Sequence, residues 1–163
     1  MKTLIFILIP ALIFGSTFYV DNYAPDHGNG SINLPFNSLN KALIKLQPGD
    51  TLILRGSNTE YGQIYFEDLD LPISGSDDLR ITVMNYQNEV VVISINSDFK
   101  IDEHYWNFKG IIFENLKTGF SKVNFSGKNN NFNNCIFRTS SVNFFDYAEK
   151  QNNQFKFCKI ESN

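Results

Sequence analysis

The chain has 163 residues, of which 42% are hydrophobic, 15% aromatic and 19% charged, and its formal net charge at pH 7 is -3. This apolar fraction with modest charge excludes a disordered chain, and the mildly acidic balance argues against nucleic acid as a partner. Two cysteines are too few for a disulfide-stapled scaffold, so a hydrophobic core must hold the fold together.

Residues 1–17 have the layout of a secretory signal peptide. Lys2 precedes an apolar run that extends from Leu4 to Phe14, and small residues at 15–17 close it. The run is too short to span a bilayer, and the alternative is a buried N-terminal strand. We expect a mature protein that starts near Phe18, is secreted to the extracellular or periplasmic space and keeps no membrane span after signal cleavage.

A single helix is expected near the N-terminus, after a brief strand at 18–20 and a loop rich in turn formers. Asn37 or Ser38 can cap this helix, and apolar residues recur at helical spacing from Leu39 to Leu46. Pro48 stops the pattern after about three turns. No second helix is predicted, because the remainder consists of β-branched and aromatic runs between turn formers. The next predicted strands are 51–54, 63–66, 79–83 and 90–95.

An internal repeat dominates the second half of the sequence. Side chains on one face of a strand are two residues apart, so positions 108 and 111 can both point inward only if a bend separates them. Gly110 and Asn134 suit that bend because both residue types tolerate a left-handed backbone, whereas Phe157 departs from the pattern. The segments 107–115, 131–139 and 154–162 align in the columns Phe108/Phe132/Phe155, Ile111/Cys135/Cys158 and Phe113/Phe137/Ile160.

A unit of about 23 residues with short strands, bends and an inward apolar column is what a coil of a parallel β-helix needs. The predicted fold class is therefore all-β, a parallel β-helix whose first coil is capped by the short N-terminal α-helix. A leucine-rich repeat fold is not predicted, because the sequence lacks its regular leucine and asparagine consensus. The alternative fold is an ordinary β-sandwich. Residues 18–163 would hold the cap and about five coils, and we expect a C-terminally truncated chain because no polar cap follows the last coil.

The repeat also predicts how the cysteines and asparagines are arranged. Equivalent positions on neighbouring coils place Cys135 and Cys158 one above the other, within disulfide reach. Stacked parallel side chains rarely achieve the disulfide torsion, so the prediction is a buried pair of thiols. The tract 128–134 could form an asparagine ladder or a simple turn, and the sequence favours the turn.

The sequence does not predict a metal site. His27 and His104 have no partner pattern for a metal or a catalytic triad, and His104 is expected to pack at a coil edge. Ca²⁺ takes six to eight oxygen ligands, and neither acidic cluster has the spacing of a known calcium loop, so both are interpreted as charged turns. These clusters are Glu67, Asp68 and Asp70, and Asp98, Asp102 and Glu103.

Several motifs resemble the N-terminal end of secreted right-handed parallel β-helix proteins of the polysaccharide lyase type. Their order is Pro35-Phe36-Asn37-Ser38-Leu39, then Pro48-Gly49-Asp50-Thr51-Leu52-Ile53-Leu54. The continuation at 79–83, 91–93 and 105–113 is similar to the opening coils of the chondroitinase B and alginate lyase family. One departure is the spacing of Gly56 and Tyr61, which four residues separate, as expected for a loop insertion.

This resemblance implies a right-handed coil and, for the full-length protein, cleavage of uronate-containing polysaccharide by β-elimination. It implies no cofactor within this chain, although Ca²⁺ is compatible with the full-length protein. No residue matches the lyases' catalytic motif, so none is assigned as catalytic, and this chain alone is expected to be inactive. The alternative is a non-catalytic carbohydrate-binding or surface-adhesion β-helix. Outward basic residues that could contact an acidic polysaccharide, if they are not simply solvated, are Lys109, Arg138 and Lys156, with Lys159 as a further position.

Overall fold

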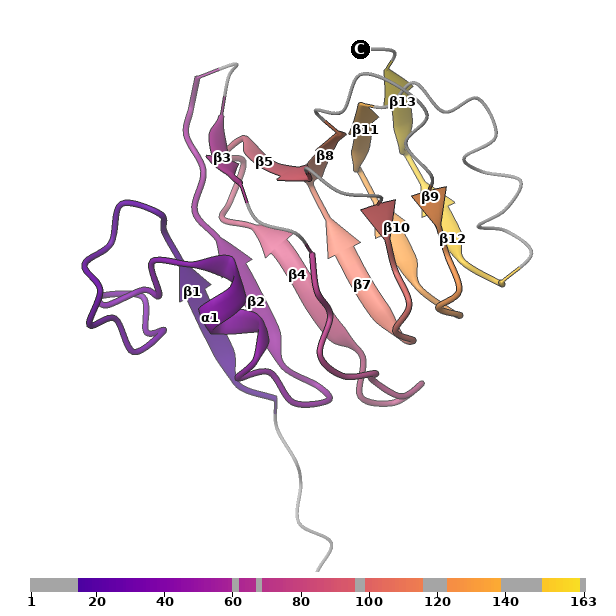
Figure 1. Cartoon of the computed structure of the whole chain (residues 1–163), viewed down its shortest axis with the longest axis horizontal. Coiled ribbons are helices and arrows are strands. Elements are labelled where there is room, and N and C mark those ends of the chain that lie inside the picture. The colour runs from indigo at the N-terminus through magenta and orange to yellow at the C-terminus, as the bar shows by residue number, and fades with distance from the viewer. Residues whose placement is uncertain are drawn as a thin grey trace, which may run out of the picture.

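The computed structural model describes residues 15–59, 62–66, 69–95, 99–115, 123–138 and 151–161. Within these ranges the named strands form three sheets, in which neighbouring strands are parallel (Figure 1). Sheet 1 has the order β1 (Thr17–Val20), β2 (Thr51–Leu54), β4 (Ile81–Asn85), β7 (Trp106–Lys109), β10 (Asn131–Asn133) and β12 (Gln154–Lys156). Sheet 2 has the order β13 (Lys159–Glu161), β11 (Ile136–Arg138), β8 (Ile111–Asn115), β5 (Val91–Ile95) and β3 (Gln63–Tyr65), and sheet 3 pairs β6 (Phe99–Lys100) with β9 (Val123–Asn124).

The strand register confirms the predicted parallel β-helix. The inward position of sheet 1 passes from coil to coil through Leu52, Val83, Phe108, Phe132 and Phe155. The rings of Phe108 and Phe132 stack with centroids 5.0 Å apart, and those of Phe132 and Phe155 with centroids 4.8 Å apart. These distances match the spacing of about 4.8 Å between neighbouring strands. The core is therefore built from columns of side chains that run along the stack of coils.

The bend between sheet 1 and sheet 2 lies where the sequence places it. Gly110, Asn134 and Phe157 occupy equivalent positions and have φ values of 65°, 53° and 55°. A Cβ atom at position 110 would collide with the side-chain amide of Asn85 in the preceding coil. Glycine is therefore needed at position 110 for both its backbone conformation and its small size.

The asparagine tract forms a ladder, so the prediction of a simple turn was wrong. Asn130 is fully buried, accepts a hydrogen bond from the Trp106 N–H (2.8 Å) and donates to the Glu103 carbonyl (2.9 Å). Its own N–H donates to Oδ1 of Asn153 one coil further on (2.8 Å). At both Asn130 and Asn153 the amide oxygen therefore accepts from a backbone N–H of the preceding coil, one strand spacing away.

The cysteines are free thiols that lie in the predicted column. Cys135 directly precedes β11 and Cys158 directly precedes β13. Cys135 is buried, as predicted, but Cys158 is only half-buried. The difference arises because Cys158 lies in the outermost described coil of the stack, at the edge of sheet 2.

The helix α1 (Leu39–Leu43) is shorter than the three turns predicted. Ser38 caps it, with its side chain accepting from the Lys41 N–H at 3.3 Å. After Leu43 the chain continues in i→i+3 hydrogen bonds, such as Leu46 N to Leu43 O at 3.2 Å, which tighten the last turn before Pro48. The buried face predicted for the helix is confirmed, and α1 lies beside β1 at the N-terminal end of the stack, as a cap requires (Figure 1).

The first described residues already form hydrogen bonds and strand pairs with the rest of the fold. The Ser16 N–H donates to Oδ1 of the buried Asp50 at 2.6 Å, and Thr17 pairs with Thr51 at the start of β1. The strand therefore begins one residue inside the segment predicted as a signal peptide, whose residues 1–14 lie outside the described residues. Over the ranges that the structure describes, no helix is long and apolar enough to cross a membrane.

Candidate functional site

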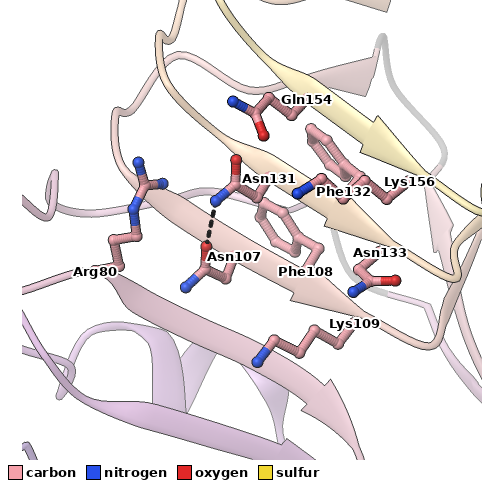
Figure 2. A pocket seen from close by; sticks show the side chains of 9 residues that line it. All are labelled: Arg80, Asn107, Phe108, Lys109, Asn131, Phe132, Asn133, Gln154 and Lys156. Atoms are coloured by element: carbon pink, nitrogen blue, oxygen red, sulfur yellow. Dashed lines mark hydrogen bonds between the residues drawn. The ribbon is translucent and has the colours of Figure 1, made fainter. Parts of the chain in front are cut away.

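A hollow of about 270 Å³ lies on the outer face of sheet 1, across strands β7, β10 and β12 (Figure 2). Its position follows from strand alternation, because Phe108 points into the core while its neighbours Asn107 and Lys109 point outward. The residues that line it are Arg80, Asn107, Phe108, Lys109, Asn131, Phe132, Asn133, Gln154 and Lys156.

The polar side chains of the hollow form two columns that run along the stack of coils. One, the amide column, consists of Asn107, Asn131 and Gln154, and the other, the cation column, consists of Lys109, Asn133 and Lys156. The amide column is linked from within, because Nδ2 of Asn131 donates to Oδ1 of Asn107 at 3.0 Å (Figure 2). Positions two residues apart on a strand separate the two columns by about 7 Å.

The cation column carries positive charge without compensation nearby. Among the described residues neither Lys109 nor Lys156 forms an ion pair, and the lining of the hollow contains no carboxylate. The two lysines are two strand spacings apart, about 10 Å, with Asn133 between them. This arrangement suits an anionic ligand that extends along the stack and presents more than one negative group.

Arg80 contributes to the same hollow and was not among the residues predicted from the sequence. Its guanidinium donates to the Asn129 carbonyl at 2.6 Å, lies 3.5 Å from Oδ1 of Asp77 and stacks 5.3 Å from the centroid of the Tyr105 ring. Arg80 is thereby fixed at one end of the hollow. It lies just before β4, and its alternation with the buried Ile81 and Val83 places it on the outer face, which is the sequence signal that could have identified it.

Arg138 does not join the other two predicted residues. It lies on β11 in sheet 2, where its guanidinium contacts Glu114 at 3.5 Å and Glu161 at 3.1 Å, both in the same register column. These carboxylates neutralise the charge that made Arg138 a candidate. Lys159, the further position, is exposed on β13 and lines a separate hollow of about 280 Å³.

The described acidic residues do not fit a calcium site. Of the predicted clusters, Glu67, Asp68 and Asp98 lie outside the described residues. Asp102 accepts a hydrogen bond from Ser126 at 2.6 Å, and Glu103 accepts one from Ser74. No group of three or more metal-binding side chains occurs in the described ranges, and the hollow offers amide oxygens but no carboxylate.

His104 acts as a hydrogen-bond acceptor at the edge of a coil. Its Nδ1 accepts from the Lys128 N–H at 2.7 Å, which joins the turns of two neighbouring coils. This contact agrees with the structural role predicted for the residue.

Two sequence comparisons relate the chain to known proteins. A family model described as "Pel9A-like, right handed beta helix region" matches residues 18–163. Over 80 residues the chain is also 38% identical to the uncharacterized protein YwoF of Bacillus subtilis (strain 168). That alignment covers 49% of this chain and 16% of the relative, so the chain spans only a small part of the relative's length. The hand of the matched family agrees with the predicted right-handed coil.

Proposed function

The chain belongs to the Pel9A-like right-handed β-helix family, and we propose that it is part of a secreted polysaccharide lyase. In this proposal the hollow on sheet 1 binds uronate-containing polysaccharide. The observation that carries the proposal is the pair Lys109 and Lys156, two cations that have no ion pair among the described residues and line one hollow with amide side chains beside them.

The chemistry of the two columns complements a polyuronate chain. Ammonium groups attract carboxylates, and amide groups both donate to and accept from sugar hydroxyls. An extended sugar chain lying along the stack would meet the cation column on one side and the amide column on the other. Carboxylates on alternate sugars could then approach Lys109 and Lys156, while Asn107 and Asn131 bind hydroxyls.

β-Elimination needs two further elements of chemistry. The carboxylate next to the C5 proton must be neutralised, and a base must lie within hydrogen-bond reach of that proton. Lys109 and Lys156 supply positive charge, but we assign neither of them as the base. We infer elimination for a longer protein that contains additional coils, and binding without turnover for the 163-residue chain.

Binding is tested by titration with oligogalacturonate, oligoalginate and chondroitin sulfate, with methyl-esterified pectin as the uncharged control. The double variant Lys109→Gln/Lys156→Gln is expected to bind about tenfold more weakly, equivalent to about 1.4 kcal/mol. Lys45→Gln removes an exposed cation outside the hollow and should leave the affinity unchanged. Equal affinities of the double variant and the unmodified chain would refute the site.

Turnover is tested by the ultraviolet absorbance of unsaturated sugar ends. We expect no such product from the 163-residue chain and a rising absorbance from a longer protein that includes it. Binding without product from both would favour the alternative, a non-catalytic carbohydrate-binding module. Turnover by the short chain would show that a base lies within it.

A further inference from the structure

The two cysteines are held in register on neighbouring coils. Two backbone hydrogen bonds hold this register on either side of the pair. The N–H of Lys159, the residue after Cys158, donates to the Cys135 carbonyl (3.0 Å), and the N–H of Asn134, the residue before Cys135, donates to the Lys156 carbonyl (2.9 Å). Neighbouring parallel strands lie about 4.8 Å apart, and the Cα atoms of disulfide-bonded cysteines lie about 4.4–6.8 Å apart. The backbone therefore holds the two residues at a separation that a disulfide can bridge. Stacked side chains rarely reach the disulfide torsion, but Cys158 is half-buried beside the edge strand β13, so its side chain can rotate toward Cys135.

The two sulfurs have the same orientation but different access to solvent. Sγ of Cys135 lies 3.5 Å from the Phe108 carbonyl oxygen, and Sγ of Cys158 lies 3.5 Å from the Phe132 carbonyl oxygen. Cys135 is 0% exposed, whereas Cys158 is half-buried. A small reagent can thus reach the sulfur of Cys158 but not that of Cys135.

The contact between the thiols makes their acidities unequal. The hydrogen bond from Cys135 to the sulfur of Cys158 stabilises the Cys158 thiolate and lowers the pKa of Cys158 to about 7. The same hydrogen bond, together with burial, raises the pKa of Cys135. Near neutral pH the accessible sulfur is therefore a substantial fraction thiolate, while the shielded sulfur stays protonated.

We propose that Cys158 and Cys135 form a thiol pair that exchanges with small disulfides, with Cys158 as the attacking residue and Cys135 as the resolving residue. In the first step the Cys158 thiolate bonds to one sulfur of the reagent, the S–S bond of the reagent breaks, and one thiolate leaves and takes up a proton. In the second step the Cys135 sulfur bonds to Sγ of Cys158, the bond between Cys158 and the reagent breaks, and the Cys135 proton passes to the departing sulfur, which leaves as the second thiol. The protein loses two electrons, and the reagent is reduced to two thiols.

The product is defined by the sequence, because the chain contains no other cysteine. The new bond would join the coil of β10 and β11 to the coil of β12 and β13. Ile111 occupies the same column in the preceding coil, so packing alone needs only an apolar side chain at this position. A purely structural pair of cysteines would remain unreactive in the native protein.

The exchange is tested by incubating the native chain with oxidised glutathione at pH 7 and measuring the intact mass. We expect the chain to lose the mass of two hydrogens without retaining glutathione, and Cys135→Ala to stop at one bound glutathione. Cys158→Ala should acquire neither change. A native chain that keeps its mass until denaturant is added, or one that stops at the mixed disulfide, would overturn the proposal.

A second measurement separates the reactive pair from a packing role. The rate of native Cys158 alkylation by iodoacetamide should reach half its maximum near pH 7 in the unmodified chain. Cys135→Ser keeps a hydroxyl donor and should retain a low midpoint, whereas Cys135→Ala should move the midpoint toward 9.0, the ordinary value for a thiol. The serine variant also remains informative if the alanine variant does not fold. The same midpoint in all three proteins would refute the role of Cys135.

Discussion

Phe157 occupies a backbone position that suits asparagine better, so Phe157→Asn should stabilise the protein. Its φ of 55° lies between those of the equivalent bend residues Gly110 and Asn134, at 65° and 53°. A left-handed backbone costs a residue with a Cβ atom about 1–2 kcal/mol, and asparagine reduces this cost through local hydrogen bonds. The phenylalanine ring offsets little of it, since 85% of the residue is exposed.

The size of the effect follows from these two terms. A large aromatic side chain covers about 150–250 Å² when fully buried, so Phe157 at 85% exposure covers about 30 Å². At about 25 cal/mol per Å², this contact contributes about 0.8 kcal/mol. Relief of the backbone cost by asparagine exceeds that loss, and the free energy of unfolding should rise by about 0.5 kcal/mol. Phe157→Ala loses the same contact without the relief and should be less stable than Phe157→Asn by about 1 kcal/mol.

Urea denaturation of the variants measures the difference, with the denaturant slope checked for constancy. Asn134→Ala, at the same bend one coil earlier, should lose about 1 kcal/mol for the same reason. If the asparagine and alanine variants at position 157 are equally stable, the left-handed backbone is not the source of the cost. If both are far less stable than the unmodified chain, the ring makes contacts that its exposure does not reveal.

Three further predictions concern buried polar groups. Asn130→Ala should lower the free energy of unfolding by about 2–4 kcal/mol, because it leaves a buried N–H and a carbonyl unpaired, whereas Asn131→Ala on the outer face should lose less than about 1 kcal/mol. Ser94→Ala should be neutral or stabilising by up to about 1 kcal/mol, as its buried hydroxyl has no hydrogen-bond partner in the described structure, and a loss above that size would refute this. Burial acts to raise the pKa of Glu89, but hydrogen bonds from Arg55 (3.0 Å) and a backbone N–H outweigh it and hold the pKa below 4.5. Because this pKa is lower in the folded state, ionised Glu89 stabilises the fold above pH 4.5, and this stabilisation is lost as the pH falls through the pKa of the folded state. Glu89→Gln should therefore lower the free energy of unfolding by about 1–2 kcal/mol at pH 7 and by less in acid, as measured by urea titrations at both pH values.

The parts of the fold that could be predicted are those that the repeat encodes directly. The column of Phe108, Phe132 and Phe155 is visible in the sequence because every coil must fill the same space in the core. The bend at Gly110 and Asn134 is visible because few residue types accept its backbone. The end of α1 was not visible, since the tightened turn after Leu43 depends on hydrogen bonds that helical spacing does not describe.

The asparagine ladder shows how local and repeated signals can compete. Asn129 and Asn152 are 23 residues apart, as are Asn130 and Asn153, so the ladder was present in the offset of the repeat. Turn propensity alone nevertheless favours an isolated turn. Propensity describes one segment at a time, whereas the hydrogen bonds of these amides depend on the stacking of coils.

The candidate site was harder to predict because the outward column that carries its charge has no common residue type. The cation column alternates Lys109, Asn133 and Lys156, and neither lysine differs in sequence context from a solvated one. What distinguishes these lysines is that no carboxylate occurs among the described residues that line their hollow, whereas Arg138 has Glu114 and Glu161 in its own column. In a stack of coils the net charge around a residue therefore depends on the residues at the equivalent positions one coil before and one coil after. A basic residue is a candidate for binding an anion only when those equivalents leave its charge uncompensated.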